Sequence, residues 1–185
     1  MNPVEPRDPR PGIEALHDAL RAIHAPSLHG FALLLTLGDR HRAAALTAAA
    51  FHAAEARAGE LRHPERAAAW LRAHVVRRAG RRDSAIDADE RMAALGPIGV
   101  TSPVLAGLAS LDRDERAAII ATWAERIDRR DVATIVGRDG DRLDNLLRRA
   151  RARFLDGHAA APTDGSPPSG PLADAVRSAA ARAMA

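Results

Sequence analysis

Apolar side chains recur at three- and four-residue spacings along most of the chain, and this period predicts amphipathic helices. In the first part of the chain the stripe begins with Ile13, Leu16, Leu20 and Ile23. It predicts helices over residues 13–23, 27–37 and 40–58, and a further helix that starts near Pro64. Gly38-Asp39 ends the second of these stretches, because both residue types favour turns.

The later part of the chain repeats the helical period after a break. Gly96-Pro97-Ile98-Gly99 and Pro103 cannot continue a helix. Asp112 is a suitable N-cap for a helix over 113–127. A short helix over 131–136 then reaches Gly137, and a longer one runs to about Phe154. No segment alternates with period two, so we predict an all-α fold.

Helix-breaking Gly and Pro residues and the distribution of charge divide the predicted helices into two small domains. Residues 27–82 carry ten Arg against four acids, and residues 83–103 carry one Arg against four acids. We predict an N-terminal extension with a short helix (1–26), a first domain (27–82), an acidic linker (83–103), a second domain (104–156), and a flexible segment with a C-terminal tail helix (157–185).

Composition excludes several classes of function. The 185 residues contain no Cys, which removes disulfides and Cys-ligated zinc. No HxxxH or HExxH pair and no nucleophile or phosphate-loop motif occurs, so we expect neither a metal, a cofactor nor an enzyme. There is no apolar run long enough to span a membrane, and we expect a cytoplasmic protein. All 27 fixed cations are Arg, a residue that binds phosphates and base edges in bidentate geometry.

A helix-turn-helix pattern lies in the second predicted domain. The short helix Asp131–Val136 meets a turn at Gly137–Gly140, and an Arg-rich helix follows. In such motifs the second helix lies in the major groove of DNA. A solvated helix face would carry similar residues, but in this context we predict DNA contacts from Arg142, Asp144, Asn145, Arg148, Arg149 and Arg151.

This domain resembles region 4 of the bacterial sigma-70 family, especially the two-domain extracytoplasmic-function type. Three motifs carry the likeness: Leu108–Arg116 for the family's L-x-x-L-x-x-x-E-R opening, Asp131-Val132-Ala133 for its Glu-Ile-Ala, and Leu147–Arg151 for its L-x-R-A-R close. In the first domain, Leu37-Gly38-Asp39, the helix over 43–51 and Ala69-Trp70-Leu71 resemble region 2. The resemblance implies a transcription initiation factor that binds promoter DNA and directs core RNA polymerase, with an anti-sigma factor as a possible partner.

The same resemblance assigns the Arg-rich end of the Trp70 helix to the promoter −10 element. Its candidate DNA contacts are Arg72, Arg77, Arg78, Arg81 and Arg82. The alternative is a basic face that only keeps the helix soluble.

The sequence departs from the family where the family binds polymerase. The Asp, Gln and Glu that hold the polymerase clamp are replaced here by Ala45, Ala48 and Ala49. Three readings follow: an initiation factor that binds polymerase through other contacts, a degenerate sigma-like DNA-binding regulator without polymerase, or an interaction module that packs its Ala-rich helix on a partner protein.

Overall fold

The computed structural model describes residues 11–57, 64–80 and 85–161, and within them every regular element is a helix. This confirms the all-α prediction. The α-helices are α1 (Pro11–Leu35), α2 (Arg40–Ala56), α3 (Pro64–Arg78), α4 (Ala88–Leu95), α5 (Ser102–Ala109), α6 (Arg113–Ile119), α7 (Arg129–Val136) and α8 (Gly140–Ala160). A 3-10 turn, η1 (Gly96–Ile98), follows α4, and a π-helical turn, η2 (Ile120–Ala124), follows α6.

Helices α1, α2 and α3 form the N-terminal half. Helix α1 runs without a break through Pro26, so the predicted boundary at residue 26 falls inside a helix. The middle of α1 contacts α2, because Arg21 pairs with Glu55 and its guanidinium lies over the Phe51 ring, 5.6 Å from the centroid. Helix α3 begins at Pro64 as predicted.

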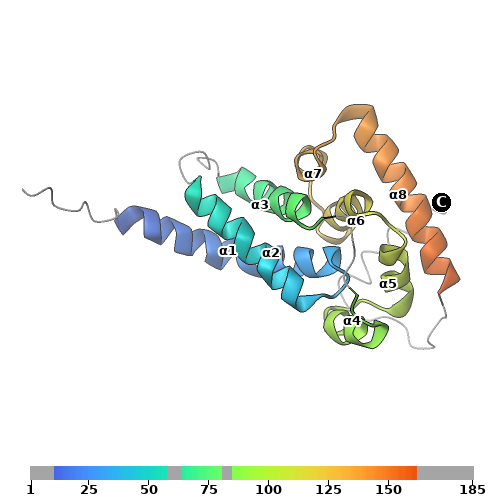
Figure 1. Cartoon of the computed structure of the whole chain (residues 1–185). Coiled ribbons are helices and arrows are strands. Elements are labelled where there is room, and N and C mark those ends of the chain that lie inside the picture. Colours follow the sequence, from blue (N-terminus) through green and yellow to red (C-terminus); the bar gives the residue numbers. More distant parts are fainter. Residues whose placement is uncertain (1–10, 58–63, 81–84, 162–185) are drawn as a thin grey trace, which may run out of the picture.

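Helices α5 to α8 form the C-terminal half, in which α8 packs along α5 and α6 (Figure 1). The approach of α5 to α8 depends on Gly107: a Cβ there would lie 2.7 Å from Cε2 of Phe154. The predicted N-cap Asp112 is confirmed, since its side chain accepts from the Glu115 amide at 2.9 Å.

The predicted acidic linker carries ordered structure. Asp87 caps α4 by accepting from the Glu90 amide at 2.7 Å. Leu95 and Val100 are buried in the core. Arg91 donates from Nη1 to the Leu37 carbonyl at 3.3 Å, which ties α4 to the end of α1. The break at Gly96–Gly99 is confirmed, with Gly99 at φ 86°.

One continuous apolar core runs through both halves. The buried residues of this core include Leu46, Phe51, Leu71, Leu108, Ile119, Val132 and Leu143, and Trp70, Trp123 and Leu147 are partly buried against it. The division into two domains therefore stays a prediction.

Arg116 joins three elements of this core. It is 2% exposed and donates to the carbonyls of Leu35, Leu108 and Leu111 at 2.8, 2.9 and 2.9 Å. The Leu35 and Leu111 oxygens lie at or beyond the ends of α1 and α5, where helical carbonyls lack an internal partner, and the Leu108 oxygen, which also accepts from the Leu111 amide at 3.3 Å, lies in the last turn of α5. A single guanidinium thus supplies hydrogen bonds that two helix ends need.

Among the described residues, no single helix is both long enough and apolar enough to cross a membrane. Only α4–η1 and α5 taken together reach the required length and apolarity, across a bend of 113°.

We predict that Arg116→Met lowers the free energy of unfolding by about 3 kcal/mol or more, because it strands buried carbonyls that each cost about 1–3 kcal/mol when unpaired. Urea denaturation followed by circular dichroism measures this. The matched control is Arg130→Met, at an exposed position of α7. Equal midpoints for the two variants would contradict the role given to Arg116.

Candidate nucleic-acid interface

The helix-turn-helix is formed by α7, a short turn and α8. Gly137 adopts φ 65° and ends α7, a left-handed conformation that glycine adopts at low cost. The Arg138 amide then donates to the Ala133 carbonyl at 3.1 Å, which closes the end of the helix. Asp139 precedes α8 in an extended conformation. The local sequence signals for this turn are therefore confirmed.

Helix α8 separates its apolar and polar faces. Leu143, Leu146, Ala150 and Phe154 are buried against the rest of the C-terminal half. The opposite face carries the predicted contact residues, of which Arg142, Asp144, Asn145, Arg148 and Arg149 are exposed and Arg151 is half-buried. The charged face of α8 is thus open to a ligand.

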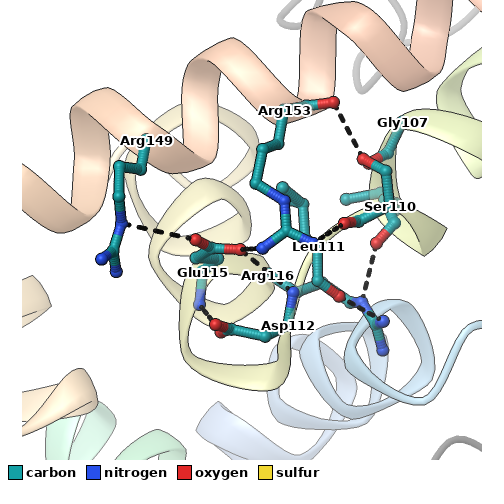
Figure 2. Close-up of polar contacts among 9 residues, drawn as sticks. Gly107, Ser110, Leu111, Asp112, Glu115, Arg116, Arg149 and Arg153 are labelled. Atoms are coloured by element: carbon teal, nitrogen blue, oxygen red, sulfur yellow. Dashed lines mark hydrogen bonds and ion pairs between the residues drawn. The ribbon is translucent and has the colours of Figure 1, made fainter.

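Glu115 fixes the middle of α8 from below (Figure 2). Its side chain is 2% exposed and accepts from Arg153 Nη1 at 2.7 Å, while Arg149 Nε lies 3.7 Å away. It also accepts from the Asp112 amide at 3.1 Å, which completes a capping box. Arg153 donates in addition to the Ser110 carbonyl at 2.6 Å. Arg149 is therefore partly engaged inside the protein.

One further contact between helices orients the first turns of α8, and a second lies within that helix. Arg129 of α7 pairs with Asp144, and this hydrogen bond lowers the pKa of the Asp144 carboxyl. The negative charge that Asp144 would present to phosphate is therefore offset by a neighbour. Arg148 Nη2 donates to the Asn145 amide oxygen at 2.5 Å. Arg142 and Arg148 are both exposed.

Asp114 links the turn of the motif to α6. It accepts from both Arg113 and Arg138, with Nη2 of Arg138 at 3.2 Å. Burial opposes ionisation of this group, but these hydrogen bonds outweigh it and lower the pKa of the Asp114 carboxyl. These three residues and Asp112 line a surface pocket of about 420 Å³.

The prediction for Arg72 is wrong. Arg72 is 5% exposed, and its Nε and Nη2 donate to the two carboxylate oxygens of Glu125 at 2.6 and 2.8 Å. Its guanidinium also lies 5.7 Å from the centroid of the Phe31 ring. All of this satisfies the cation inside the protein, so Arg72 is not available to DNA.

The other cations of this region have different positions. Arg77 and Arg78 are exposed in the last turn of α3. The pKa of His74 is lowered, mainly by burial and in addition by the positive charges of Arg77 and Arg78. Arg81 and Arg82 lie outside the described residues.

The predicted polymerase face is the outer side of α2. Ala45 and Ala48 are exposed and Ala49 is half-buried. This surface therefore presents methyl groups where the family presents polar groups.

Sequence reasoning missed Glu115, Arg129 and Arg153 as residues that hold α8. A signal for Glu115 was present, because an acid three residues after the N-cap Asp112 is the pattern of a capping box. Arg129 and Arg153 carry no such signal, since their partners are distant in sequence.

Comparison with protein-family models, with curated proteins and with solved structures yields no match. The resemblance to sigma-70 factors therefore rests on the sequence motifs alone. Among the described residues, no three His, Asp or Glu side chains gather where they could hold a metal ion.

We predict that acid destabilises the protein through His74. This residue stacks on Trp70 at 5.5 Å, and burial, with the charges of Arg77, Arg78 and Arg57, lowers its pKa below the ordinary value of about 6.5. The unfolded chain then binds more protons than the folded one, so the free energy of unfolding falls as the pH drops through about 6.5.

Urea denaturation at about pH 7.5 and about pH 5.5 tests this. His74→Phe keeps a ring against Trp70 but cannot be protonated, so the loss of stability on acidification should shrink. His41→Phe, at an exposed position of α2, is the matched control. The role of His74 is excluded if the two variants lose equal stability on acidification.

Proposed function

We propose that this protein is a sigma-70-like transcription factor that binds promoter DNA through α8. The observation that supports the proposal most is the exposed polar face of α8, placed after a tight turn and held from behind by α5 and α6. This is the arrangement by which helix-turn-helix proteins insert a recognition helix into the major groove.

The side chains of the first turns of α8 suit this role. Arg142 and Arg148 present guanidinium donors, which bind phosphate oxygens or the O6 and N7 acceptors of guanine. Arg129 offsets the charge of Asp144, so repulsion from the DNA backbone is reduced there. Arg149 and Arg153 orient the helix through Glu115 and add positive charge along it.

The second candidate function is a sigma-like DNA-binding regulator that does not bind core RNA polymerase. It is favoured by the exposed methyl groups of Ala45 and Ala48. Loss of a polar hot spot at an interface costs about 2 kcal/mol or more, and three such positions are alanine here. The first candidate requires another surface for polymerase.

We predict that Arg142→Ala and Arg148→Ala each weaken duplex binding. A lost base contact costs about 1–3 kcal/mol, or roughly five- to 150-fold in Kd, and relaxes the sequence preference. A lost phosphate contact weakens binding to all sequences alike and reduces the slope of log K against log salt by about 0.9. Fluorescence anisotropy with duplexes selected from a random pool, at several salt concentrations, measures both quantities.

Arg66→Ala is the matched control for these variants, because Arg66 is an exposed arginine near the start of α3, away from α8. Unchanged affinity and salt slope in both α8 variants would remove α8 from the proposal. Absence of any duplex binding by the unmodified protein, together with a stable complex with another protein, would favour the interaction module.

A pull-down with core RNA polymerase separates the first two candidates. We predict that the unmodified protein binds polymerase weakly, and that the triple variant Ala45→Asp, Ala48→Gln, Ala49→Glu binds at least about tenfold better if the family's contact surface is otherwise intact. A control triple variant with Ser at the same positions distinguishes the specific side chains from polarity in general. Tight binding and promoter-specific initiation by the unmodified protein would rule out the regulator.

A further inference from the structure

The N-terminal half (α1–α3) and the C-terminal half (α5–α8) meet through core packing. We infer that they act as one rigid body, and that the DNA ligand is a single duplex segment of about one helical turn, not two separated promoter elements. The inference about the ligand rests on the function proposed above; the inference about the single body does not.

Apolar packing holds the two halves together. Leu34 of α1 lies among Val104, Leu108, Ile120 and Phe154 of the C-terminal half, and the void left between them is only about 20 Å³. Burial of a leucine side chain away from water is favourable. Leu28, Phe31 and Leu35 belong to the same continuous core. Separation of the halves would expose many of these side chains together.

Polar contacts fix the orientation in which the halves pack. The Arg72–Glu125 pair joins α3 to the residue after η2, with side chains 6% and 19% exposed. Arg116 of α6 donates to the Leu35 carbonyl of α1 at 2.8 Å. Such pairs contribute little net stability when solvation is counted, but a buried charge that loses its partner is strongly destabilising. Alternative orientations of the two halves are therefore disfavoured.

The helix-turn-helix is itself attached to the N-terminal half. Helix α7, the first helix of the motif, packs against α3, and α8 lies on the far side of α5 and α6 (Figure 1). The position of α8 relative to α3 is therefore set by the core, and the exposed Arg77 and Arg78 cannot move independently of α8.

This geometry limits the length of DNA that the protein can read. The exposed contact residues of α8 run from Arg142 to Arg149, or about 11 Å along the helix at about 1.5 Å per residue. This is less than one turn of B-DNA, which is about 34 Å long. A body that presents one such helix, with no freedom between its halves, contacts one continuous stretch of duplex.

The two tryptophans test the single body, because Trp70 belongs to α3 and Trp123 to η2. The variants Trp123→Phe and Trp70→Phe each leave one fluorescent reporter, in the N-terminal and the C-terminal half respectively. We expect their urea midpoints to coincide with each other and with the circular dichroism transition of the same variant, as for a two-state unit. Midpoints that separate within a variant would overturn the single body.

A distance measurement covers the case in which a Trp variant is poorly folded. The chain has no Cys, so Ala44→Cys on α2 and Ala109→Cys on α5, both exposed, give one labelled pair across the halves. We expect a single narrow distance distribution by fluorescence transfer that does not change with duplex DNA. Added urea is the control that shows the labels can detect separation. A second, longer distance in buffer or on DNA would overturn the inference.

Selection from a random-sequence duplex pool tests the ligand. We expect one conserved stretch of about ten base pairs, and an affinity that survives trimming of the duplex to about one and a half turns. Two conserved stretches separated by more than a turn would overturn the inference that the ligand is a single duplex segment, and would leave the proposal of DNA binding intact. Absence of binding to any duplex would overturn both the inferred DNA ligand and the proposed function. Coincident tryptophan transitions would still support the inference that the two halves form one rigid body.

Discussion

The structure depends on two adjacent residues of α6 that point to opposite sides. Glu115 is directed at α8, where it accepts from Arg153, and Arg116 is directed at the ends of α1 and α5 (Figure 2). Both side chains are 2% exposed. Burial of a charge is expensive unless it is paired and hydrogen-bonded, and these contacts meet that requirement only when α1, α5 and α8 are all in place. The short helix α6 therefore couples α8 to α1.

The same chemistry recurs at the helix ends of this protein. A guanidinium donates to a carbonyl near the end of α1 (from Arg91), of α3 (from Arg42), of α4 (from Arg40) and of α5 (from Arg153). The last carbonyls of a helix lack internal partners and carry partial negative charge, so a cation there is favourable. In a chain without lysine, the planar guanidinium reaches several such oxygens at once. Part of the arginine content thus serves the fold.

The sequence was sufficient for features that depend on local chemistry. Pro64, Asp112 and Gly137 mark helix limits through their own backbone and capping preferences, and all three predictions are confirmed. The polar face of α8 was also predictable, because its apolar period leaves the arginines on the other side. The passage of α1 through Pro26 was not, since contacts such as Arg21–Glu55 come from another helix. The burial of Arg72 was not predictable for the same reason, because its partner Glu125 is 53 residues away in the sequence.

Arginine counts consequently overstate the charge available for nucleic acid. Residues 27–82 have a net charge of +6 by composition, but Arg72 is neutralised by Glu125, and Arg40 and Arg42 are bonded to carbonyls. On α8, Arg153 is paired with Glu115, whereas Arg142 and Arg148 stay at the surface. What separates Arg72 and Arg153 from Arg142 and Arg148 is a mostly buried carboxylate, Glu125 for Arg72 and Glu115 for Arg153. The proposed DNA contacts therefore fall at the start of α8, the part of a helix-turn-helix that meets the bases.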